Sequence, residues 1–87
     1  MQARFQNKKY EVVLTEHAKL QMSLRNISEA EVLEVIETEE AKAKEMENRF
    51  WVFKTLKGRD DNMVSLSISI ESPRLIVITT MINWSPK

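Results

Sequence analysis

The sequence predicts an α+β fold in which two helices cover one face of an antiparallel sheet, with the elements in the order β-α-α-β-β-β. Two short segments in the first half place a hydroxyl residue before an amphipathic run, as capped helices do. Residues 63–70 read as a strand, in which apolar side chains alternate strictly with serine from Val64 to Ile70, as is typical of an antiparallel strand. Residues 75–82 are apolar on both faces, so we expect that strand to lie centrally. We expect residues 1–87 to form a single domain.

The first strand is expected at residues 10–14, which are rich in β-branched side chains. Residues 4–6 are a candidate partner strand, joined to it by a turn at residues 7–9. We expect the first helix at residues 16–25, with Thr15 as its cap and Asn26 as a left-handed stop.

A second helix is expected from Ser28 to about Glu39, because Ser28 and Glu31 have the spacing of a capping box. Its buried stripe comprises Val32, Val35 and Ile36, extended by Leu33.

The second half supplies the sheet that both helices need. Residues 49–56 read as a strand, residues 58–62 as a hairpin loop and residues 71–74 as a turn. Residues 43–46 are a candidate for one more short strand. In the alternating strand, one set of side chains is expected beneath the helices, namely Val64, Leu66, Ile68 and Ile70. The other set is expected to be accessible to solvent, namely Ser65, Ser67 and Ser69.

Composition narrows the classes of function. The chain has no cysteine and a single histidine, so we expect no disulfide, no metal site and no cofactor. The first residues are polar and no apolar run approaches the ~20 residues of a membrane helix, so we expect a cytoplasmic protein without a membrane anchor.

The formal net charge is zero, which argues against a strongly basic nucleic-acid-binding protein. Acidic side chains concentrate in residues 31–47, so the remainder of the chain is basic. Within it, Arg49 and Lys54 are candidates for holding a nucleic-acid phosphate, although a solvated surface is the stronger interpretation of such scattered cations. The neighbouring aromatic side chains Phe50, Trp51 and Phe53 have two interpretations, stacking on bases and core packing, and core packing is the stronger.

The histidine lies in a polar stripe of the first helix. His17, Gln21 and Arg25 are spaced four residues apart, with Leu20 and Leu24 on one side and Ala18 and Met22 on the other. Polar groups between two apolar rows are expected close to a core, where each needs a hydrogen-bond partner or faces a ligand.

These residues also carry a family resemblance. The run His17-Ala18, Met22, Arg25-Asn26-Ile27-Ser28 and Glu31-Val32, together with Ile78-Thr79-Thr80, resembles the bacterial family called domain of unknown function 4258. The likeness extends over residues 14–80. The chain departs from the family pattern at Gln21, where arginine is usual, and at Asn26, where glycine is usual.

The resemblance implies a fold similar to that of the RelE/ParE-like toxins, which include proteins that cleave messenger RNA. Carried over residue by residue, it implies that His17, Arg25 and, more weakly, Thr80 are site residues. Metal-free RNA cleavage needs a proton acceptor, a proton donor and cations over the phosphate. His17 suits either proton transfer, and Arg25 or Lys54 suits the phosphate. The structural alternatives are a histidine bonded to the backbone and an arginine that faces the helix dipole.

Two functions of different classes follow from these observations. The first is an interaction domain that binds a protein partner or forms a homodimer through an edge strand or an open sheet face. The second is a toxin-like, metal-independent ribonuclease or translation-blocking module, with RNA as its partner. The neutral charge and the missing arginine at position 21 favour the interaction domain.

Overall fold

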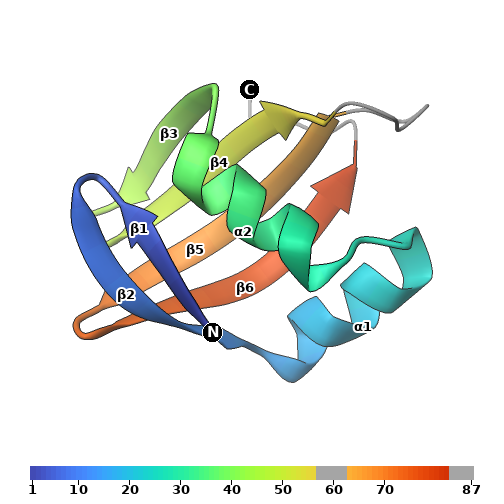
Figure 1. Cartoon of the computed structure of the whole chain (residues 1–87), viewed down its shortest axis with the longest axis horizontal. Helices are drawn as coiled ribbons and strands as arrows, with labels where there is room; N and C mark the ends of the chain where they lie inside the picture. The colour runs from blue at the N-terminus through green and yellow to red at the C-terminus, as the bar shows by residue number, and fades with distance from the viewer. Residues whose placement is uncertain (57–62, 83–87) are drawn as a thin grey trace.

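The computed structural model describes residues 1–56 and 63–82, and in these ranges the chain forms two helices and one six-stranded sheet. The expected α+β architecture is confirmed, and both candidate extra strands are present (Figure 1). In chain order the elements are β1 (Gln2–Phe5), β2 (Lys8–Leu14), α1 (Glu16–Arg25), α2 (Glu29–Thr38), β3 (Ala41–Met46), β4 (Arg49–Thr55), β5 (Met63–Glu71) and β6 (Arg74–Ile82). The hairpin loop expected at residues 58–62 lies outside the described residues.

The strands are arranged in the order β1-β2-β6-β5-β4-β3, so β6 is central as its sequence predicts. Neighbouring strands are antiparallel except β2 and β6, which run parallel with Val12 opposite Leu75. The expectation of a wholly antiparallel sheet is therefore wrong for this one pair. A parallel pair needs a long crossover connection, and the helices and strands between β2 and β6 provide it.

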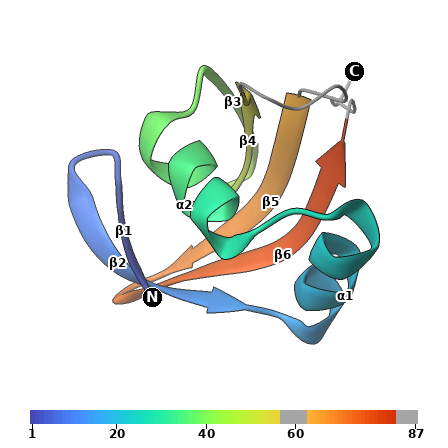
Figure 2. The ribbon, with the colours of Figure 1, turned by 45° about the vertical axis from the view of Figure 1, so that its right-hand side comes forward.

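The sheet curls around α2, and both helices lie on its concave face (Figure 2). α2 contacts β1, β4 and β5, whereas α1 packs against β6. The expected helix stripe and the apolar set of β5 meet in the core, where the side chains of Val32, Val35, Ile36, Val64, Leu66 and Ile68 are all fully buried. Ile70, near the end of β5, is half-buried.

Both helix starts follow the sequence prediction. The Thr15 hydroxyl accepts a hydrogen bond from the Ala18 N–H, and Asn26 ends α1 in the left-handed conformation. The Ser28 and Glu31 side chains form a complete capping box at the start of α2. The first turn is shorter than expected, because Gln6 and Asn7 both have positive φ and join β1 to β2 alone.

The serines of β5 are buried rather than accessible, which corrects the expectation from the alternating pattern. Ser65, Ser67 and Ser69 are 0%, 4% and 6% exposed. They face away from the helices, but β5 has a neighbour on each side, and all six side chains opposite the serines are larger: Phe53, Trp51 and Arg49 on β4, and Met81, Thr79 and Ile76 on β6. A short serine side chain lies below the level of such neighbours. Alternation therefore identified the two faces of the strand without revealing its neighbours.

Candidate functional site

The helix that carries the polar stripe is fixed to the sheet at its first turn. The Thr15 hydroxyl accepts from the Ala18 N–H at 3.0 Å and donates to the Ile78 carbonyl of β6 at 2.9 Å. The Thr15 N–H also donates to the Val77 carbonyl, which continues the β2–β6 ladder into the cap. The N-terminus of α1 is therefore positioned by the central strand.

Only one of the two apolar rows of α1 reaches the core. Ala18 and Met22 are 0% and 7% exposed, whereas Leu20 and Leu24 are 56% and 70% exposed. The polar stripe between the rows lies at the boundary of the core: His17 is exposed, and Gln21 and Arg25 are half-buried. The expectation that His17 is held close to the core is therefore wrong, because the helix turns one apolar row outward.

The predicted catalytic residues do not share one exposed surface. His17 and Arg25 are on the same helix but eight residues apart, which is about 12 Å along the axis. Thr80 is on β6 and is fully buried, so its hydroxyl is closed to a substrate in this conformation. Among the described residues, the Thr80 Oγ1 atom and the Gln21 Oε1 atom are buried without hydrogen-bond partners.

The two predicted nucleic-acid-binding residues, Lys54 and Arg49, are both on β4 but lie on opposite faces of the sheet, because the number of residues between them is even. The Lys54 Nζ atom donates to the Thr38 carbonyl at 3.4 Å, so this cation binds the C-terminal end of α2. Arg49 stands opposite Ser69 on the face without helices. Its Nε atom is buried and has no hydrogen-bond partner within the described ranges.

The aromatic residues of β4 are divided in the same way. Phe50 packs edge-on against Phe5 with ring centroids 5.9 Å apart, on the concave face. Phe53 is 9% exposed on the other face, and Trp51 beside it is half-buried. Core packing therefore accounts for Phe50, and Phe53 is the most buried ring of the three.

The structure thus brings together only His17, Gln21 and Arg25, along one helix. In residues 1–56 and 63–82, no three histidine, cysteine or acidic side chains gather into a possible metal site. No helix in these ranges is long and apolar enough to cross a membrane.

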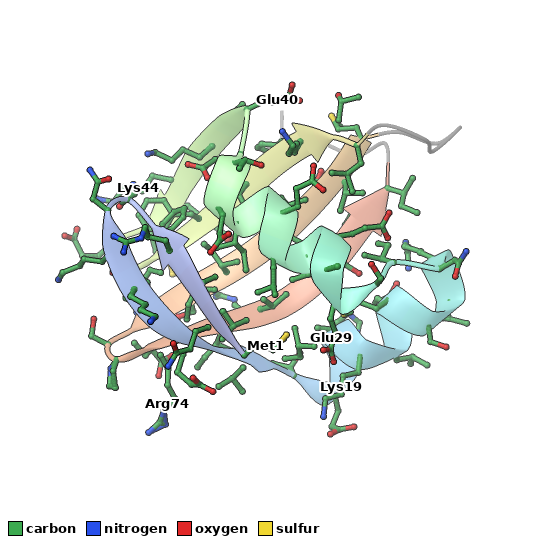
Figure 3. The ribbon with its side chains drawn as sticks, in the orientation of Figure 1. Met1, Lys19, Glu29, Glu40, Lys44 and Arg74 are labelled. Atoms are coloured by element: carbon green, nitrogen blue, oxygen red, sulfur yellow. The ribbon has the colours of Figure 1, made fainter. Side chains whose placement is uncertain are left out.

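Two surface features were not singled out by the sequence reasoning. One is the outward leucine row of α1, where the sequence signal was the presence of two apolar rows on a helix of only ten residues. The other is the outer edge of β3, an exposed strand in which Lys42 and Lys44 alternate with alanines. Figure 3 labels Lys44 on β3, and Lys19 pointing away from α1 on the opposite side of the molecule.

The comparisons with known proteins give one result. A family model described as Domain of unknown function (DUF4258) matches residues 14–82, which include α1, α2 and the strands from β3 to β6. No curated protein and no solved structure matches the chain significantly.

Proposed function

This chain belongs to the family described as Domain of unknown function (DUF4258), and we propose that it is a non-catalytic interaction domain that binds another protein through α1. The observation that carries the proposal is the exposure of Leu20 and Leu24, at 56% and 70%. They are four residues apart and so adjoin on one helix face, with His17 beside them.

Single exposed apolar residues are normal on a protein surface, whereas contiguous apolar patches rimmed by polar residues mark interaction sites, and two adjoining leucines are a candidate centre of such a patch. In the described part of the chain, the large apolar side chains that are exposed are Val13, Leu20, Leu24 and Met46, and only the two leucines share a helix. A stable interface buries about 1,200–2,000 Å² in total, of which two leucines supply a small part. The proposed occupant is therefore a partner protein that extends beyond α1, rather than a second copy held by these leucines alone.

A fold similar to the RelE/ParE-like toxins is part of the proposal, and the β-α-α-β-β-β core supports it. The proposed compartment is the cytoplasm, which suits a sequence without cysteine.

The test begins with tagged chain expressed in a bacterial host. A captured protein is then purified and titrated against the wild type, against Leu20→Lys/Leu24→Lys and against Met46→Lys. Met46 is a matched control because it is also 56% exposed but lies on β3. We expect the double variant to bind at least about tenfold more weakly, which is 1.4 kcal/mol, and the control to bind like the wild type. Equal binding by all three would reject α1 as the docking surface. Light scattering that shows a wild-type dimer, lost in the double variant, would replace the partner with a second copy.

A metal-independent ribonuclease is the second candidate, favoured by the exposed imidazole of His17, which is open to an RNA 2′-hydroxyl. Inducible expression scored for growth arrest, combined with RNA cleavage by the purified chain, tests it. An enzyme would lose cleavage in His17→Ala with unchanged stability, whereas the interaction domain cleaves no RNA in either form.

A further inference from the structure

We propose that the outer edge of β3 binds an extended acidic segment of a partner protein, which adds a strand to the sheet. This proposal goes beyond the function above because it uses a terminal strand of the sheet instead of α1. It rests on three features of the edge: the direction of its backbone groups, the state of the opposite edge, and its lysines.

The backbone of β4 shows which groups of β3 are unpaired. The Ile70 N–H donates to the Asn48 carbonyl at 2.8 Å, at the end of the ladder in which Phe50 faces Ile68. Hydrogen-bonded pairs alternate along an antiparallel ladder, so the even-numbered residues of β4 turn their backbone groups toward β5. Its odd-numbered residues turn theirs toward β3, and the Phe53 carbonyl indeed accepts from the Glu40 N–H at 2.8 Å.

Lys42 and Lys44 stand opposite Val52 and Phe50, which are even-numbered residues of β4. They therefore occupy non-hydrogen-bonded positions and turn their own N–H and C=O groups away from the sheet. β3 is a terminal strand, so these groups face outward, where an extended chain can pair with them.

The other terminal strand, β1, is already occupied. The Val12 N–H donates to the Met1 carbonyl, so by the same alternation Arg4 turns its backbone outward. The Arg4 N–H donates to the Glu37 carboxylate of α2 at 3.0 Å. A strand added at β1 would have to break this hydrogen bond, so β3 is the more open of the two edges.

The two lysines of β3 favour an acidic occupant on the face that they share, although the surrounding residues 39–47 also carry Glu39, Glu40, Glu45 and Glu47. The Lys42 ammonium lies 6.0 Å from the centre of the Phe5 ring, and Lys8 stands opposite Phe5 on the same face. Lys44 is 3.5 Å from Glu47, whose side chain is 95% exposed, so a carboxylate of a partner competes with it at little cost. Acidic side chains two residues apart on an added strand would face Lys42 and Lys44 together.

The same lysines reject a second copy. Outward-facing residues can form hydrogen-bonded pairs only with outward-facing residues of the other strand. Antiparallel pairing of two β3 edges therefore places Lys42 or Lys44 opposite a lysine when their strands overlap fully. Lysines and bulges protect many sheet edges from aggregation, and β3 has a register shift between Lys44 and Met46. The lysines repel a strand of like charge but do not repel an acidic one.

The probes are two capped heptapeptides, one alternating glutamate with valine and one alternating lysine with valine. We expect the glutamate peptide to bind and to shift the amide resonances of Lys42, Ala43 and Lys44, and the lysine peptide to bind at least about tenfold more weakly. A glutamate peptide N-methylated on the groups that pair should also lose about tenfold, because strand addition needs its N–H groups.

Two variants of β3 and two control variants test whether the peptide binds at the β3 edge. Lys42→Glu/Lys44→Glu should reverse the preference between the peptides, whereas Lys9→Glu/Lys19→Glu, with the same change in net charge, should keep it. Lys42→Pro removes an outward N–H and leaves the β3–β4 ladder intact, so it should weaken the glutamate peptide about tenfold. Leu20→Lys/Leu24→Lys should have no effect, which separates this proposal from binding through α1.

Several results would overturn strand addition at β3. They are no binding of the glutamate peptide at millimolar concentration, equal binding of both peptides, indifference to N-methylation, and resonance shifts confined to other elements. The N-methylated peptide keeps the test decisive if Lys42→Pro fails to fold.

Discussion

The two helices are alike in length and capping and differ in what they bury. Each has ten residues and a hydroxyl side chain at its N-cap. α2 lies inside the curl of the sheet and buries Val32, Val35 and Ile36 completely, whereas α1 buries an alanine and a methionine and exposes two leucines. The comparison separates a helix that holds the fold together from one that presents a surface.

The largest difference in the free energy of unfolding is expected between Ile36→Ala in α2 and Leu24→Ala in α1. Ile36 is fully buried in the core, so its truncation should lower the free energy of unfolding by about 2–5 kcal/mol. Leu24 is 70% exposed, so its truncation should change stability by less than about 0.5 kcal/mol. Urea denaturation gives both values, and similar losses would contradict the division between the helices.

The next test concerns the cap that fixes α1 to the sheet. Thr15→Ala removes both the helix cap and the hydrogen bond to Ile78, so we expect a loss of about 1–2 kcal/mol in urea denaturation. Thr15→Ser keeps the hydroxyl and should recover most of it. A Thr15→Ala variant as stable as the wild type would show that α1 does not depend on this contact.

The cap of α2 is exposed and should matter less. Ser28→Ala should cost on the order of 1 kcal/mol, and Ser28→Gly only a few tenths. Urea midpoints for the two variants measure the difference. If Ser28→Ala costs more than Thr15→Ala, the contact of Thr15 with β6 adds no stability.

The smallest effect is expected at His17. Because His17 is exposed, His17→Ala should change stability by less than about 0.5 kcal/mol. A histidine with a buried hydrogen-bond partner would cost roughly 1–3 kcal/mol instead. A loss in that range in urea denaturation would indicate that His17 has a buried hydrogen-bond partner. It would also argue against α1 as a helix that presents a binding surface.

Local signals in the sequence predicted most of the fold. The caps at Thr15 and Ser28 and the stop at Asn26 depend on hydrogen bonds within a few residues, and all three are present. The central position of β6 followed from its apolar character on both faces. These features need no knowledge of distant contacts.

What the sequence could not show depends on packing between distant segments. The burial of Ser65, Ser67 and Ser69 depends on neighbouring strands, and the parallel pairing of β2 with β6 leaves no mark in the period of β2. The outward direction of Leu20 and Leu24 could not be predicted for the same reason, since an amphipathic pattern with two apolar rows does not say which row faces the sheet. Of the predicted site residues, His17 and Arg25 lie on one helix, while Thr80, Lys54 and Arg49 lie apart; their roles stay predictions.

The pairing of β2 with β6 also bears on how the chain folds while it is being synthesised. Thr15 binds the Ile78 carbonyl, 63 residues later in the chain, at the end of the parallel ladder. Until β6 leaves the ribosome, β2 lacks its inner neighbour, α1 lacks the strand it packs on, and their apolar side chains remain open to chaperones and to other nascent chains. Contacts so distant in sequence close slowly. We therefore expect the N-terminal elements to be synthesised first but to dock onto the sheet only after β6 has been synthesised.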